Sequence, residues 1–145
     1  MPVLLGIDFG EKRIGVAVTD ETASMAFPLT CLGFKSRKQV LEDLQKIIKE
    51  YNVIKIVAGL PKTLKGEIGL AAIKIMKHVE WFRSQMDIPW DLSDERMSTA
   101  EVERILLAAD VSRAKRKEVR DQLAAQRILQ VYLDNLRNGR QGLSS

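Results

Sequence analysis

The stretch that decides the fold is Val-Leu-Leu-Gly-Ile-Asp-Phe-Gly-Glu-Lys-Arg-Ile-Gly-Val-Ala-Val-Thr, residues 3–19. Its two apolar runs, 3–9 and 13–19, have the length and side-chain types of buried strands. Only residues 10–12 separate them, and so short a connection joins two antiparallel strands as a hairpin. The first of the three is glycine, which adopts turn conformations that other residues resist. The chain therefore begins with a β-hairpin, and Asp8 interrupts its first strand.

The rest of the chain alternates between helix and strand patterns. A third strand over 27–34 extends the hairpin to a meander, and Pro28 makes its start either a sheet edge or an irregular entry. A strand that follows a helix usually pairs in parallel with a neighbour. We predict helices at 37–51 (capped by Ser36), 68–86, 98–109 and from Ser112 to about Leu136, with strands at 53–59 and 89–93. The result is an α/β fold: a mixed five-stranded sheet, made of a three-strand antiparallel meander and two parallel strands, flanked by helices.

The length of 145 residues suits one domain, and no linker divides it. We assign residues 1–137 to that domain and expect 138–145, which lack apolar periodicity, to be a mobile tail. Lysine and arginine number 23 against 19 acidic residues, a net charge of +4. This excess favours an anionic partner without proving one. No apolar run is long enough to span a bilayer, and the N-terminus lacks a signal-peptide pattern, so we expect a cytoplasmic protein without a membrane partner.

Cysteine and histidine occur once each, as Cys31 and His78. A single cysteine excludes an internal disulfide and a zinc site built on several cysteines. Any metal must therefore be held mainly by carboxylates, which favours a hard ion such as Mg²⁺ or Mn²⁺. We expect Cys31 to be a small core residue and His78 to lie at the surface or its boundary.

Three acidic positions do not have the pattern of ordinary surface residues. Asp8 lies in an apolar strand, where a buried carboxylate needs a compensating partner; the alternative is a residue that caps the following turn. Asp94 and Glu95 follow the last predicted strand, at the edge where open α/β sheets place ligands. The alternative for this pair is two solvated acids before a helix.

Asp121 is the most informative of the acids. It precedes Ala125 and Ile128 by four and seven residues in the final helix, so it shares the inner apolar stripe of that helix. The alternative is an acid at the edge of the stripe, paired with Lys117 or Arg120. Carboxylates that converge from the first strand, the last strand and the final helix repel one another unless a cation lies between them. One or two Mg²⁺ or Mn²⁺ ions there, about 3.5–4 Å apart, would form a phosphoryl-transfer site.

Four stretches carry a resemblance to a known family. They are Gly-Ile-Asp-Phe-Gly-Glu-Lys-Arg-Ile-Gly-Val-Ala-Val-Thr-Asp (6–20), Val-Ala-Gly-Leu-Pro (57–61), Asp-Glu-Arg-Met-Ser-Thr (94–99) and Asp-Gln-Leu-Ala-Ala-Gln-Arg-Ile-Leu-Gln-Val-Tyr-Leu-Asp (121–134). In this order the chain resembles the YqgF family, also called RuvX, over about residues 4–136. The resemblance implies a ribonuclease H-like fold related to the Holliday junction resolvase RuvC. It also implies a nuclease active in maturation of the 5′ end of 16S rRNA, although some members are described as junction resolvases.

The resemblance also implies roles for individual residues. Asp8, Glu95 and Asp121 match the family's catalytic, metal-binding acids, and Asp94 is placed to share or replace the role of Glu95. The segment 62–69 is more basic than the family's usual pattern, which puts details of the substrate loop in doubt but leaves the carboxylates untouched.

Basic residues surround the predicted acidic centre and suit a phosphate backbone. The alternative is a set of solvated helical and loop charges. The predicted nucleic-acid-binding residues are Lys12, Arg13, Lys62, Lys65, Arg113, Lys115, Arg116 and Lys117.

The leading hypothesis is thus a metal-dependent phosphodiesterase that acts on structured RNA, with ribosomal precursor particles as candidate partners. One alternative is a resolvase of branched DNA, which would need a homodimer; monomer and homodimer both stay open. A second is an RNA-binding ribosome-assembly factor with little hydrolysis. The Gly-Ile-Asp-Phe-Gly stretch also resembles the phosphate loop of actin-like ATPases, but 145 residues leave no room for the second domain that those enzymes need.

Overall fold

The computed structural model describes residues 3–10, 12–61, 69–95 and 113–143. At positions 61, 94, 95, 113–119 and 137–143 the description covers the backbone. Lys62, Lys65 and the predicted helix at 98–109 lie outside the described residues, as does Ser112, the predicted first residue of the final helix. The elements in chain order are β1 (Val3–Phe9), β2 (Arg13–Thr19), β3 (Ala26–Gly33), α1 (Arg37–Tyr51), β4 (Val53–Pro61), α2 (Leu70–Ser84), β5 (Trp90–Glu95) and α4 (Arg113–Leu143).

The five strands form one mixed sheet in the order β3-β2-β1-β4-β5. Strand β2 pairs antiparallel with both β1 and β3, while β1, β4 and β5 run parallel. The predicted meander and the two predicted parallel strands are therefore confirmed. Pro28 lies in the edge strand β3, as expected for a residue without a backbone N–H, and the β2–β3 register shifts beside it.

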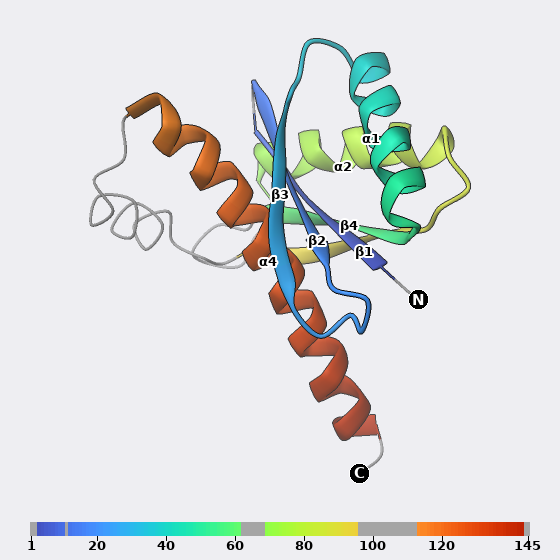
Figure 1. The fold of residues 1–145 in the computed structure, drawn as a ribbon. Helices are drawn as coiled ribbons and strands as arrows, with labels where there is room; N and C mark the ends of the chain where they lie inside the picture. Colours follow the sequence, from blue (N-terminus) through green and yellow to red (C-terminus); the bar gives the residue numbers. More distant parts are fainter. Residues whose placement is uncertain (1–2, 11, 62–68, 96–112, 144–145) are drawn as a thin grey trace.

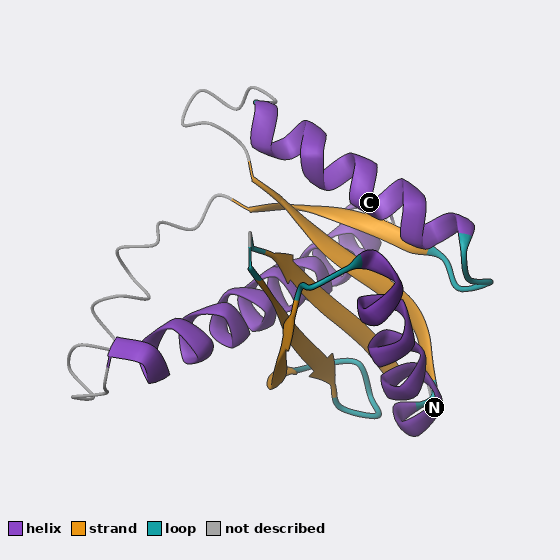
Figure 2. Cartoon of the chain, turned by 90° about the horizontal axis from the view of Figure 1, so that it is seen from above, coloured by secondary structure: helices purple, strands orange, loops and turns teal. Residues whose placement is uncertain are grey.

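Helices cover the two faces of the sheet unequally. Helices α1 and α2 lie on one face, and α4 crosses the other, where it contacts all five strands (Figures 1 and 2). The core on the α1/α2 face contains Leu5, Ile7 and the buried side of both helices, including Leu44 and Phe82. The smaller core under α4 is built around Leu4, Val57 and the helix's own residues Ala125, Ile128, Leu129, Tyr132 and Leu133. The inner stripe predicted for the final helix, with Ala125 and Ile128, is thus confirmed.

Local signals explain where the first helix begins and ends. The Ser36 hydroxyl accepts a hydrogen bond from the backbone N–H of Gln39 at 3.2 Å, which confirms the predicted N-cap. Asn52 ends the helix in a left-handed conformation, with φ of 56°, a conformation that asparagine tolerates better than most residues. Among the described helices, none is long and apolar enough to cross a membrane.

Several predicted boundaries are wrong. Strand β4 runs to Pro61 rather than ending at 59, and helix α2 ends at Ser84 rather than at 86. Strand β5 covers Trp90–Glu95 rather than 89–93, because its backbone pairs in register with β4 as far as Glu95 opposite Pro61. Ladder hydrogen bonds use backbone groups, so two acidic residues do not end the strand. Helix α4 continues to Leu143 instead of ending near Leu136, since an established helix gains one hydrogen bond per added residue. Residues 138–143 are therefore helical, and the mobility of 138–145 stays a prediction.

Candidate active site

Asp8 lies near the carboxyl end of β1, on the face that α4 covers. Strand side chains alternate between faces, and Leu5 and Ile7 belong to the core under α1 and α2. Leu4 belongs to the core under α4. A Cβ on Gly6 would lie 2.8 Å from Leu129 Cβ of that helix. Asp8 continues this second series, so its side chain is on the α4 side of the sheet.

Helix α4 touches the sheet at Gly15, the residue of β2 that pairs with Asp8. Gly15 of β2 is the register partner of Asp8, and directly opposed residues share a face of an antiparallel pair. A side chain at Gly15 would collide with the backbone carbonyl of Asp121. The absent side chain at this glycine therefore lets the Asp121 turn of α4 rest on the strand beside Asp8. The structure thus brings the backbone of Asp121 against the strand position that pairs with Asp8.

The carboxylate of Asp121 is mostly buried, with 18% of its side chain exposed. Its Oδ2 lies 3.8 Å from Arg13 Nε of β2 and 3.8 Å from Cys31 Sγ of β3. Burial raises the pKa of Asp121, while the charges of Arg13 and Arg120 and the Cys31 thiol oppose that rise. The predicted inward position is confirmed, and the ion pair joins α4 to Arg13 of β2 on the sheet face that the helix covers.

Glu95 is the last residue of β5, and Asp94 precedes it. Because β1, β4 and β5 run parallel, their carboxyl ends lie at one edge of the sheet. Asp8 is one residue from the end of β1. The backbone therefore carries all three acidic positions toward the same edge, although the side chains of residues 94 and 95 lie outside the description.

The available donors suit a hard metal ion. Asp8 and Asp121 supply carboxylate oxygens, the ligands that Mg²⁺ and Mn²⁺ prefer. Within the described parts of the chain, no group of three or more histidine, cysteine, aspartate or glutamate side chains is placed to hold a metal. Asp8 and Asp121 thus suit a divalent metal ion, and a third ligand has to come from residues such as Glu95.

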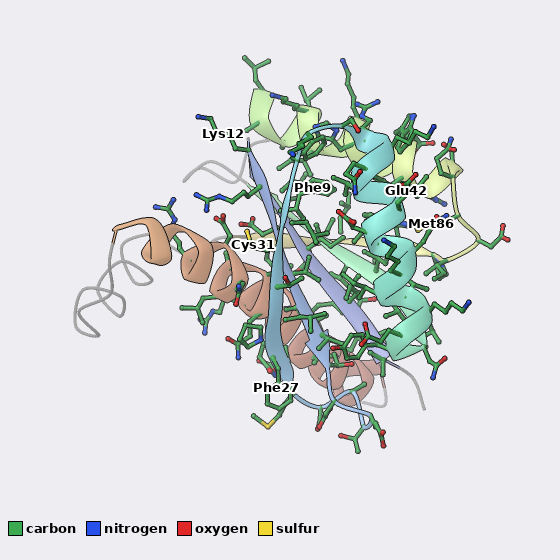
Figure 3. The ribbon with its side chains drawn as sticks, turned by 45° about the horizontal axis from the view of Figure 1, so that its top comes forward. Phe9, Lys12, Phe27, Cys31, Glu42 and Met86 are labelled. Atoms are coloured by element: carbon green, nitrogen blue, oxygen red, sulfur yellow. The ribbon has the colours of Figure 1, made fainter. Side chains whose placement is uncertain are left out.

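The predicted basic residues divide into three groups. Lys12 is exposed at the end of the β1–β2 hairpin (Figure 3), and Arg13 lies beside Asp121. Lys62 and Lys65 are outside the described residues. The backbone of α4 places the last group in the turns that precede Asp121 along the helix: Arg113, Lys115, Arg116 and Lys117.

Cys31 is the site neighbour that sequence reasoning missed. We expected a small core residue, but it is partly exposed and points from β3 toward α4 (Figure 3). Cys31 is the register partner of Gly15, which explains its proximity to Asp121. No pattern along β3 indicates this contact, because it depends on the register between strands and on the docking of α4.

A second polar network fastens α4 farther along the helix. Tyr132 donates a hydrogen bond to Asp91 of β5 at 2.8 Å and accepts one from Lys55 of β4 at 3.1 Å. The Lys55 ammonium also lies 5.7 Å from the centre of the Tyr132 ring, a favourable cation–π distance. Because Asp91 begins the α4-facing series of β5, this network fixes how the helix crosses the parallel strands.

Comparison with known proteins identifies relatives along nearly the whole chain. A family model described as RuvX: Holliday junction resolvase matches residues 2–135. A protein of Desulforudis audaxviator, named "Putative pre-16S rRNA nuclease", is 44% identical over 137 residues, covering 94% of this chain and 97% of its own length. A protein of the same name from Thermoanaerobacter pseudethanolicus is 46% identical, with 93% and 98% covered.

Solved structures share the fold at low sequence identity. Thermus thermophilus RuvC in complex with a Holliday junction substrate aligns with a TM-score of 0.54 at 14% identity, covering 96% of this chain and 97% of that one. The Fowlpox virus resolvase bound to Holliday junction DNA aligns with a TM-score of 0.54 at 10% identity, covering 92% and 98%. These similarities confirm the ribonuclease H-like architecture, and at such identities they speak to the fold alone.

Proposed function

The chain belongs to the RuvX family, and from this premise we propose that it is a divalent-metal-dependent nuclease that processes the 5′ end of the 16S rRNA precursor. The family and its relatives support a nuclease, a hydrolase that acts on nucleic acid. The RNA substrate is supported by the names of the relatives at 44% and 46% identity. Metal dependence is supported by the acids of the site.

The observation that carries the proposal is the contact of Asp121 with the strand position opposite Asp8. Two carboxylates from β1 and α4 are expensive to hold near each other in a mostly buried place unless a cation is bound there. We propose that Asp8, Asp121 and Glu95 hold one or two Mg²⁺ or Mn²⁺ ions. Bound there, such ions supply a nucleophile from water and neutralise charge at the scissile phosphate.

Strand alternation favours Glu95 over Asp94 as the third acid. Asp91 is hydrogen-bonded to Tyr132 of α4, so position 91 belongs to the face under that helix. Positions two and four residues farther along a strand share its face. Position 95 belongs to this series and position 94 does not. We therefore propose Glu95 as the principal ligand from β5.

The basic residues complete the proposal. Phosphate contacts by lysine and arginine position a nucleic acid without reading its sequence. Lys12 lies in the hairpin that follows Asp8. The basic residues of α4 lie in the helical turns that precede Asp121. We propose that Lys12, Arg13, Lys62, Lys65, Arg113, Lys115, Arg116 and Lys117 contact the phosphate backbone of the substrate.

Branched DNA is the second candidate substrate, because the family model carries the description Holliday junction resolvase. Symmetric cleavage of a junction requires two active sites, and hence a dimer. A ribosome-assembly factor that binds RNA with little hydrolysis is the non-enzymatic alternative.

One assay separates these functions. The chain is incubated with a 16S rRNA precursor fragment and with a four-way DNA junction, each in Mn²⁺ or in EDTA. We expect cleavage of the RNA in Mn²⁺, none in EDTA and little on the junction. Asp8→Asn should abolish cleavage, while Asp134→Asn, which changes an exposed acid on the same helix as Asp121, should keep it. Cleavage of the junction alone would favour the resolvase, and RNA binding without any product would favour the assembly factor.

A further inference from the structure

Backbone hydrogen bonds of the β1–β2 hairpin hold Arg13 at the site. The Gly10 N–H donates to the Arg13 carbonyl at 2.9 Å, and the Phe34 N–H donates to the carbonyl of the preceding Lys12 at 2.9 Å. A Cβ on Gly10 would lie 2.6 Å from the Arg13 carbonyl oxygen, so glycine permits this tight turn. The hairpin thus fixes the origin of the Arg13 side chain on the α4 face of β2.

Among the described residues, Arg13 and Cys31 balance the charge of the Asp121 carboxylate from 3.8 Å, which is longer than a strong hydrogen bond. Arg13 Nε and Cys31 Sγ both lie 3.8 Å from Oδ2. At 3.8 Å a guanidinium forms an ion pair rather than a hydrogen bond, and a thiol is a weak donor. An ion pair at this distance is favourable in a mostly buried place, yet it leaves the carboxylate oxygen able to accept another ligand.

We infer that Arg13 is a positioning residue: it stands in for the metal's positive charge at Asp121 in the metal-free protein and gives up that contact when a divalent cation binds. This inference rests on the proposed function and assigns Arg13 a role distinct from general phosphate contact. The guanidinium offsets the buried charge while the site is empty of cation. It also competes with an incoming ion for the same carboxylate.

The substitution Arg13→Gln separates this role from a structural one. Without metal, the Asp121 charge loses its partner, so the melting temperature in EDTA should fall by about 2–4 °C. The competition also disappears, so the Mn²⁺ dissociation constant measured by calorimetry should fall by about threefold or more. A residue that only supports the fold would not tighten metal binding when it is removed. Arg13→Lys keeps the charge and should restore most of the metal-free melting temperature.

Lys12→Gln is the matched control, because it removes the same charge from the adjacent position of the same hairpin. Arg13 and Arg120 act on the Asp121 carboxylate, and Lys12 is not among the charges that do so. We therefore expect Lys12→Gln to leave the metal-free melting temperature and the Mn²⁺ affinity near the wild-type values. Equal Mn²⁺ affinities in the Arg13→Gln and Lys12→Gln proteins would overturn the inference.

A double-mutant cycle isolates the contact itself. In the Asp121→Asn background there is no carboxylate charge to balance, so adding Arg13→Gln should change the metal-free melting temperature by less than half as much as in the wild type. An equal loss in both backgrounds would overturn the role of Arg13. If Asp121→Asn instead keeps the wild-type Mn²⁺ affinity, the proposed metal site itself fails. The two failures are thus distinguishable.

Discussion

Asp121 shows at the scale of one residue why this site is costly to fold. Burial raises the pKa of its carboxyl, and the charges of Arg13 and Arg120 offset only part of that effect. An ionised Asp121 at neutral pH therefore opposes folding in the absence of metal. Groups held in such unfavourable states gather at functional sites more often than elsewhere.

His78 is a second perturbed residue, on the other face of the sheet. Its ring stacks on Phe9 at 5.6 Å and contacts the ring of Phe34, and its Nδ1 accepts a hydrogen bond from Arg37 Nε at 3.2 Å. Burial and the charges of Arg37 and Lys74 lower the pKa of His78. The boundary position expected from the sequence is confirmed, and the contact with Arg37 requires a neutral imidazole nitrogen.

This environment predicts a pH dependence of stability. The pKa of His78 is lower in the folded chain than its ordinary value of 6.5, so the unfolded chain binds the proton more readily. The contribution of neutral His78 to the free energy of unfolding is fully present above about pH 6.5. It is lost as the pH falls through the folded-state pKa. His78→Asn should lower stability at every pH but flatten the decline between about pH 7.5 and 5.5. Urea unfolding of both proteins across that range checks this, and parallel declines would contradict it.

At the scale of elements, the site depends on how closely α4 approaches β2. Gly15 lies in the middle of β2, between β1 and β3, where a side chain would normally stand between the sheet and the helix. The Asp121 turn occupies that space instead. Farther along, the Tyr132 network with Lys55 and Asp91 fixes the same helix. Together these contacts determine where the Asp121 carboxylate lies.

Gly15→Ala should therefore displace the helix. The added methyl group meets the Asp121 carbonyl, and overpacking of this kind costs about 1–3 kcal/mol. Gly33→Ala is the matched control in the same sheet, since nothing lies within 4 Å of a Cβ there, and it should be close to neutral. Denaturant unfolding of the two variants gives the comparison. Equal stability of both would show that the helix does not rest on Gly15.

At the scale of the whole molecule, local patterns predicted the elements and their order well. The short link between β1 and β2 indicated the hairpin, and the helices before the later strands indicated the parallel pairs that the sheet contains. Apolar spacing along the final helix also placed Asp121 inward. These inferences succeed because period and connection length are properties of neighbouring residues.

Contacts between distant segments were beyond that reasoning. The approach of Arg13 and Cys31 to Asp121 joins β2, β3 and α4, and it depends on strand register and helix docking. Likewise, the end of α4 at Leu143 is not marked by apolar periodicity, because backbone hydrogen bonds carry the helix beyond the sheet. The roles of Asp8, Glu95 and Asp121 as metal ligands stay a prediction.

Whether these acids hold a metal is measured by the Mn²⁺-induced shift of the melting temperature in wild type and in Asp121→Asn. Bound metal stabilises the fold by RT ln(1 + [L]/Kd). Mn²⁺ should therefore raise the melting temperature of the wild type, and raise that of Asp121→Asn much less. In EDTA, Asp121→Asn should melt at or above the wild-type temperature, because a buried charge is removed. Asp134→Asn should behave as wild type in both conditions. An Asp121→Asn protein that melts lower in EDTA and keeps the full Mn²⁺ shift would show that Asp121 is a structural residue and not a metal ligand.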